Sequence, residues 1–141
     1  MERYFTLREA QAMLPQLRPV LQQLRDLYAS WVDKAYRLRE IQQQSSGGTP
    51  SVDEGEVFQL EAEIDFLVLQ GRPLLDYLDA EGVLLKDIRH GLVDFPACME
   101  GEEVLLCWHL GEERIAHWHY EWEGFPGRKP IPDSFHEEEE D

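Results

Sequence analysis

The segment CWHLGEERIAHWH, residues 107–119, places one thiol and three imidazoles close together in the chain. Its potential donor side chains are Cys107, His109, His117 and His119. Zinc prefers thiolate sulfur and imidazole nitrogen, so C-x-H followed by H-x-H suggests a metal site. This spacing is not a common zinc motif, and side chains two residues apart on a strand stand about 6 to 7 Å apart. We therefore predict that these residues pack and that no cofactor is bound, with zinc as the alternative.

The register of the predicted β-hairpin decides which of these side chains share a face. With a three-residue turn at 111–113, Cys107 lies opposite His117 and the odd-numbered residues line one side. A turn of two or four residues would separate the set, because a one-residue slip reverses one strand. In either strand Trp108 and Trp118 belong to the even-numbered set, which we place against the helices.

Charged residues in and around this segment form a second candidate site. The weak catalytic candidates are Asp87, Asp94, Glu112, His119 and Arg128. A carboxylate or imidazole can move a proton, and a guanidinium can bind a carboxylate or phosphate. However, the sequence has no nucleophile motif, glycine-rich phosphate loop or H-E-x-x-H helix. We favour a structural interpretation, in which salt bridges fix the turns and His119 hydrogen-bonds to a carboxylate such as Glu112 or Asp94.

Two long helices must position this hairpin. Thr6 and Glu9 have the spacing of a capping box, and apolar residues continue at alternating three- and four-residue intervals. The pattern predicts a helix over 6–43 with a kink or break near Pro15, where a short helix would end and a longer one begin. Ser51 and Glu54 begin a second helix over 53–80, which Gly82 ends. Residues 42–52 are rich in Gly and Ser, and we expect a mobile loop there.

The two apolar seams predict an antiparallel helical hairpin. The first seam contains Leu7, Ala10, Leu14, Leu17, Leu21, Leu24, Tyr28, Trp31, Ala35 and Leu38, and the second Val57, Leu60, Ile64, Leu67, Gly71, Leu74 and Leu78. Further apolar residues lie off these seams: Val20, Leu27, Ile41, Phe58, Phe66, Leu69, Leu75 and Tyr77. They need a cover, which is either the rest of the chain or a second copy, and we expect a homodimer.

Beyond Gly82 the sequence changes to short runs of β-formers separated by RHG, MEGE, LGEE and EGFPG. These runs predict three or four antiparallel strands within 83–131. We expect the acidic tail, 133–141, to be disordered. The chain is thus predicted to be a single α+β domain, 1–141, in which a helical hairpin (6–80) packs with a small antiparallel sheet.

Charge limits the partners. Subtracting 29 acidic from 13 basic residues leaves −16, which repels phosphate backbones and anionic lipid headgroups. We therefore expect neither nucleic-acid nor membrane binding. No segment is apolar for the length of a membrane span, and Cys98 and Cys107 are more consistent with reduced thiols than with a disulfide framework. The predicted location is cytoplasmic.

The order FTLREAQAMLP, GVLLKDIRHGLVDFP, CWHLGEERIAHWH and GFPGRKPI resembles a bacterial family known as domain of unknown function number 2203. The matching residues are Lys86, Asp87, Gly91, Asp94, Phe95, Pro96, Cys107, Trp108, Gly111, Glu112, Trp118, His119, Gly124 and Arg128. His109 and His117 depart from its pattern. The resemblance implies a small helical and β protein and carries no substrate, cofactor or catalytic residue.

Two function classes remain. The helical seams favour a non-enzymatic oligomeric interaction module. The cysteine–histidine hairpin favours a metal- or small-anion-binding protein with hydrolase-type chemistry centred on 107–128. The natural ligand and the pathway do not follow from the residues.

Overall fold

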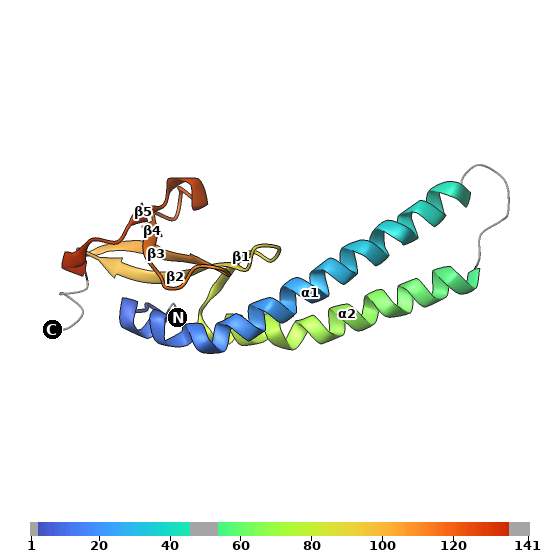
Figure 1. The fold of residues 1–141 in the computed structure, drawn as a ribbon, viewed down its shortest axis with the longest axis horizontal. Coiled ribbons are helices and arrows are strands. Elements are labelled where there is room, and N and C mark those ends of the chain that lie inside the picture. The colour runs from blue at the N-terminus through green and yellow to red at the C-terminus, as the bar shows by residue number, and fades with distance from the viewer. Residues whose placement is uncertain (1–2, 46–53, 136–141) are drawn as a thin grey trace.

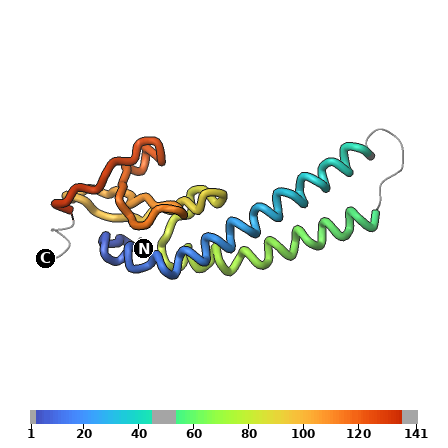
Figure 2. Tube along the Cα trace, viewed as in Figure 1, coloured from blue at the N-terminus to red at the C-terminus, as the bar shows by residue number. Residues whose placement is uncertain are grey.

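A computed structural model describes residues 3–45 and 54–135. Two long helices precede a five-stranded antiparallel sheet, which confirms the predicted α+β class. The elements are α1 (Leu7–Ser45), α2 (Glu54–Glu81), β1 (Leu84–Asp87), β2 (Leu92–Met99), β3 (Glu102–His109), β4 (His117–His119), the 3₁₀ helix η1 (Phe125–Gly127) and β5 (Lys129–Pro130). Figure 1 shows the sheet above the start of α1, while the rest of the hairpin extends away as an arm. The tube in Figure 2 shows the same division.

The predicted capping box begins α1. The Thr6 N–H donates to Oε1 of Glu9 at 2.9 Å, and the Glu9 N–H donates to Oγ1 of Thr6 at 3.0 Å. Of the two alternatives predicted near Pro15, a kink or a break, the break is absent, because α1 is one helix of 39 residues that contains both Pro15 and Pro19. Both prolines are exposed, and Figure 1 shows the helix axis bending within its blue first part. A bend accommodates the lost hydrogen bonds without ending the helix.

The antiparallel hairpin forms as predicted, but the α1 seam has two partners. Its first residues, from Leu7 to Leu24, are buried in the core beneath the sheet, whereas the later seam residues lie along α2 in the arm and are less buried. Gly71 is buried in α2 and faces Leu24 and Leu27 of α1. At the end of α2, Gly82 has φ 81°, and the Val83 N–H bonds to the Leu78 carbonyl at 2.9 Å. This arrangement is a Schellman motif, and it confirms that Gly82 ends the helix.

The sheet is a meander in the order β1-β2-β3-β4-β5, with one or two more strands than predicted. The extra pairing comes from the short β5, which lies beside β4. The β2–β3 hairpin turns at Glu100 and Gly101, whose φ values of 51° and 81° suit a two-residue type I′ turn. Pro96 is tolerated in β2 because its side of the strand faces the N-terminal segment, where its carbonyl accepts the Phe5 N–H at 2.7 Å.

The main core lies between α1 and one face of the sheet. From the sheet it contains Val93, Phe95, Ala97, Val104, Leu106 and Trp108. Phe5 meets Phe95 edge to face, with ring centroids 5.3 Å apart. Trp108 is fully buried and Trp118 is half-buried against the same core, which confirms that both tryptophans face the helices. The Trp108 ring also lies under the guanidinium of Arg18 from α1.

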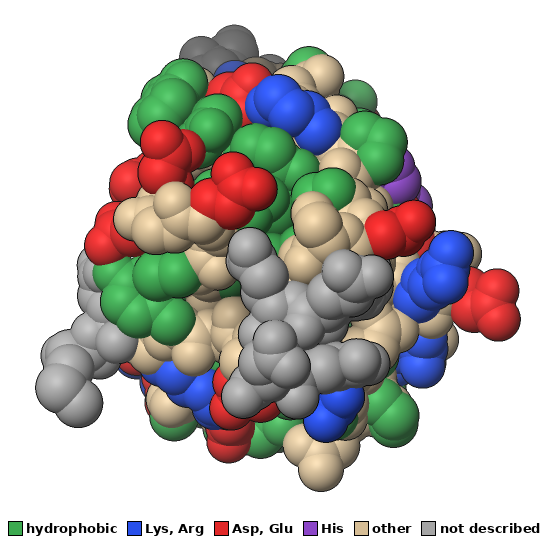
Figure 3. Space-filling view, turned by 90° about the vertical axis from the view of Figure 1, so that its left-hand side faces the viewer, with side chains coloured by type: hydrophobic (Ala, Val, Ile, Leu, Met, Phe, Trp, Pro, Cys, Tyr) green, Lys and Arg blue, Asp and Glu red, His purple; other side chains and the backbone are tan. Residues whose placement is uncertain are grey.

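Two predicted boundaries are wrong. Residues 42–45, assigned to a mobile loop, continue α1, because polar residues with ordinary helix propensity can prolong an established helix. Residues 133–135, assigned to the disordered tail, form a helical turn that buries Phe135 in the core. The Ser51 capping box and residues 46–53 and 136–141 lie outside the described residues. Figure 3 views the sheet end of the molecule, where hydrophobic side chains are visible between acidic and basic ones.

Candidate functional site

The candidate residues gather on the face of the sheet that points away from the helices. Asp94 of β2 lies directly opposite Cys107 of β3, and Cys107 lies directly opposite His117 of β4. The second of these pairs matches the register expected for a three-residue turn, which was one of the alternatives that the sequence left open, although β3 and β4 are joined by residues 110–116. Figure 1 shows the segment before β5 covering this face from above. Consequently, this face is partly enclosed.

Asp94, Cys107 and His119 form a buried cluster. Nε2 of His119 lies 3.1 Å from Oδ1 of Asp94, and both side chains are 3% exposed. The predicted pairing of His119 with a carboxylate is therefore present. Nδ1 of His119 lies 2.7 Å from the carbonyl oxygen of Tyr120. Sγ of Cys107 is also close, because the donor atoms of all three residues lie within 4.8 Å of one another.

Burial controls the protonation of two members of this cluster. It raises the pKa of the Asp94 carboxyl, although the charge and hydrogen bond of His119 oppose the increase. Burial, together with the negative charge of Asp94, raises the pKa of the Cys107 thiol to about 11. At neutral pH Cys107 is therefore a protonated thiol, which is a poor nucleophile.

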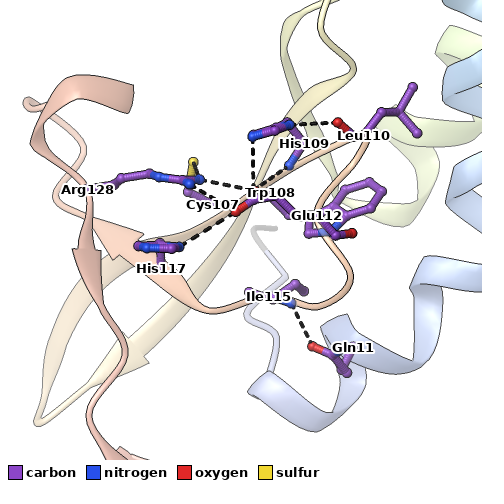
Figure 4. Close-up of polar contacts among 9 residues, drawn as sticks. All are labelled: Gln11, Cys107, Trp108, His109, Leu110, Glu112, Ile115, His117 and Arg128. Atoms are coloured by element: carbon purple, nitrogen blue, oxygen red, sulfur yellow. Dashed lines mark hydrogen bonds and ion pairs between the residues drawn. The ribbon is translucent and has the colours of Figure 1, made fainter.

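Glu112 connects the β3–β4 turn to the segment before β5. Arg128 donates to both carboxylate oxygens, from Nη1 at 3.0 Å and Nη2 at 2.9 Å, and the His109 N–H donates at 3.0 Å. Figure 4 shows Arg128, His109 and His117 directed toward this carboxylate. Burial acts to raise the pKa of Glu112, but the bonds from Arg128 and His109 outweigh it and lower the pKa. The same Arg128 reaches Sγ of Cys107 at 3.9 Å and so links Glu112 to the buried cluster.

The chain can now be compared with known proteins. A family model described as an uncharacterized conserved protein (DUF2203) matches residues 3–131. The chain belongs to the DUF2203 family. No curated protein and no solved structure matches it. No helix in the two described ranges combines the length and apolar character needed to cross a membrane.

In this DUF2203 protein the remaining candidates lie apart from the buried cluster. Asp87 is the half-buried last residue of β1, where its carboxylate contacts Nδ1 of His90 at 2.9 Å and accepts the Arg89 N–H. His109 and His117 flank Glu112 at 3.5 and 3.7 Å. Nδ1 of His117 is buried and lacks a hydrogen-bond partner among the described residues, since 3.7 Å exceeds hydrogen-bond distance. The four-donor set C-x-H and H-x-H therefore does not converge.

The arrangement fits binding better than nucleophilic catalysis. A cysteine, a histidine and an aspartate adjoin as in a nucleophilic triad, but Cys107 is only 1% exposed and protonated. A hollow of about 780 Å³ between α1 and the β3–β4 turn is lined by His117, Arg8 and Arg114, among others. The three buried residues do not line it. A substrate in this hollow therefore has no direct contact with the thiol.

The pairing of Asp94 with Cys107 was missed by the sequence reasoning. The signal is the Glu100–Gly101 dipeptide between two runs of β-formers. A two-residue turn there puts Met99 opposite Glu102 and, five residues further along each strand, Asp94 opposite Cys107. Without the β2–β3 register, Asp94 and Cys107 belong to separate candidate sites.

Proposed function

We propose that this DUF2203 protein is a non-enzymatic interaction module that self-associates through the outer surface of α2. The observation that carries the proposal is an apolar row, defined as Phe58, Ala62, Phe66 and Leu69. Its members follow one another at four-, four- and three-residue intervals, so they form one stripe along the helix. Phe58 is 75%, Phe66 62% and Leu69 65% exposed.

The off-seam apolar residues support the same surface. On α1, Ile41 is buried, and Val20 and Leu27 are half-buried. On α2, Phe58, Phe66, Leu69 and Leu75 remain exposed, and only Tyr77 is half-buried. The sheet covers the base of the hairpin, and the arm extends beyond it (Figure 1). A cover for the α2 residues must therefore come from outside the described part of the chain.

A second copy of the protein is the occupant that fits. An apolar groove of about 230 Å³ also runs between the helices, with Tyr28, Trp31, Val68 and Leu75 in its lining. Val68 and Leu69 are consecutive and differ by about 100° around α2, so the groove lies on a different face of the helix from the apolar row. Across a twofold axis, the apolar row of one copy packs against the same row of the other copy.

The outer surface of α2 is long enough for a helix–helix contact between two copies. The 28 residues of α2 extend about 42 Å, and one helix is about 10 Å wide. The product is on the order of 400 Å² per copy, which corresponds to a small interface. Each copy carries a net charge of −16, so electrostatic repulsion opposes association and added salt reduces this repulsion.

Light scattering tests the proposal. We expect a dimer at tens of micromolar, a tighter dimer at higher salt, and a monomer for the double variant Phe58→Ser, Phe66→Ser. Trp122→Ser is the matched control, because Trp122 is 79% exposed but lies in the segment after β4. A monomeric wild-type protein, or a dimer that both variants leave intact, would contradict the proposal.

A further inference from the structure

The buried cluster of Asp94, Cys107 and His119 supplies three potential metal ligands from three adjacent strands. As whole residues, Asp94 is 2%, Cys107 1% and His119 2% exposed. One oxygen of Asp94, Sγ of Cys107 and one ring nitrogen of His119 all lie within 4.8 Å of one another. Because Asp94 and Cys107 are directly opposed in the β2–β3 ladder, their backbones fix the spacing of two of these donors.

The orientation of His119 matches that of a metal-bound imidazole. A carbonyl oxygen is an acceptor, so the contact between Nδ1 and Tyr120 requires a proton on Nδ1. This bond leaves Nε2 directed at Asp94 and toward the cluster. Histidine ligands of metals commonly donate their second ring N–H to a backbone carbonyl or a carboxylate, which fixes both tautomer and ring orientation.

We propose that Asp94, Cys107 and His119 bind one zinc ion. Zinc commonly uses carboxylate oxygen, thiolate sulfur and imidazole nitrogen, and a three-residue set leaves its fourth position for water. Typical Zn–N and Zn–S bonds of about 2.0 to 2.3 Å require the donors to move closer together than 4.8 Å. Changes of side-chain torsion angles supply this movement.

Charge balance favours a divalent cation. A thiolate from Cys107 and a carboxylate from Asp94 together carry two negative charges, and the two positive charges of a zinc ion cancel them. The occupied cluster therefore has no net charge, which avoids the large free-energy cost of burying an uncompensated charge.

The positive charge of Arg128 does not strongly oppose zinc binding. The Arg128 guanidinium lies 3.9 Å from Sγ of Cys107, but both of its Nη atoms bond to Glu112. The Glu112 carboxylate therefore offsets most of the arginine charge near the metal. With Glu112 fixing Arg128, the guanidinium is also placed to hydrogen-bond to the Cys107 thiolate.

Zinc titration of the metal-stripped, untagged protein tests the proposal. We expect one zinc per chain, a raised melting temperature and release of protons when the ligands bind the ion. Asp94→Asn and Cys107→Ser should each weaken binding by more than the roughly 10- to 100-fold typical of losing an outer-shell group. Cys98→Ser is the matched control, because Cys98 is exposed and outside the cluster. It should bind zinc as the wild type does.

A cobalt spectrum keeps the test independent of whether the site variants fold. In Cys98→Ser protein, Cys107 is the sole remaining thiol, so a thiolate-to-cobalt charge-transfer band must come from it. Deleting residues 136–141, which read HEEEED, removes a second group of metal-binding side chains and should preserve this band. The proposal is overturned if the cobalt band is absent. It is also overturned if deleting residues 136–141 abolishes zinc binding, or if the Cys107→Ser variant still binds zinc as the wild type does.

Discussion

Arg128 holds Glu112 by two parallel hydrogen bonds, of 3.0 and 2.9 Å, and so attaches the segment before β5 to the β3–β4 turn. The exposed fractions of the two side chains are only 17% and 16%, so water screens the pair weakly. A lysine retains the charge but cannot reproduce the two-pronged geometry. The pair is therefore a specific point at which the sheet can be weakened.

We predict that Arg128→Lys lowers the free energy of unfolding by about 1.5 to 3 kcal/mol, the usual contribution of a hydrogen bond to a charged group. Urea unfolding measures the change. Arg37→Lys is the control, because the Arg37–Glu56 pair on the helical arm is 48% and 37% exposed and should change stability by less than about 1 kcal/mol. Equal losses in the two variants would contradict the prediction.

The capping box at Thr6 and Glu9 predicts a dependence on acid. The hydrogen bond from the Thr6 N–H lowers the pKa of Glu9 below its ordinary value of 4.5. The ionised Glu9 carboxylate thus stabilises the folded protein above pH 4.5, and this stabilisation is lost as pH falls through the lower folded-state pKa of Glu9. We expect Glu9→Gln to reduce the acid-induced loss of stability and Thr6→Ala to cost about 1 kcal/mol at neutral pH. Unfolding followed by circular dichroism across this range tests both, and parallel acid curves for Glu9→Gln and wild type would argue against the first.

Trp108 should be the most sensitive tryptophan. Trp108 is 0% exposed, so Trp108→Ala should lower the free energy of unfolding by about 3 to 5 kcal/mol. Trp118 is half-buried, so Trp118→Ala should lower it by less. Trp122, at 79% exposed, should change stability by less than about 0.5 kcal/mol when replaced by Ala. Denaturant midpoints rank the three variants, and an unchanged midpoint for Trp108→Ala would show that the packing is misassigned.

Gly91 and Gly101 both have positive φ values, 60° and 81°, but their surroundings differ. A Cβ on Gly91 would lie 2.6 Å from Cγ and Cδ1 of Leu110, whereas a Cβ on Gly101 meets nothing within 4 Å. Gly101→Ala should therefore cost only the backbone strain of about 1 to 2 kcal/mol, and Gly91→Ala should cost more. Thermal melts compare them, and adding Leu110→Ala should recover part of the Gly91→Ala loss if the clash is the cause.

Local signals predicted much of this fold. The Thr6–Glu9 box, the two apolar seams and the terminating Gly82 depend on residues within a turn or two of each other, and all three were predicted correctly. A kink and a break were both expected near Pro15, and the sequence alone did not decide between them; the helix continues because packing under the sheet holds its first turns in place. Phe135 was assigned to the tail because acidic residues follow it, but it is buried in the core and only 3% exposed.

The candidate site was predicted less completely because it depends on several strands at once. The sequence left the register of β3 with β4 open, and the structure has the alternative in which Cys107 lies opposite His117. Predicting whether Glu112 or Asp94 is the partner of His119 requires the β2–β3 register as well. The positions of the other two histidines depend on side-chain direction, since His109 and His117 turn toward Glu112 instead of joining Cys107.

The meander order of the sheet has a consequence for folding kinetics. Each strand pairs with its neighbour in the chain, and the helices form a hairpin, so most contacts close short loops. Contact order is low for both parts, and each can form quickly on its own. The long-range steps are those that dock the chain's beginning on the sheet, namely Phe5 to Pro96 and Gln11 to Ile115. Closing these large loops carries the greater entropic cost, so docking of the α1 start should limit the folding rate.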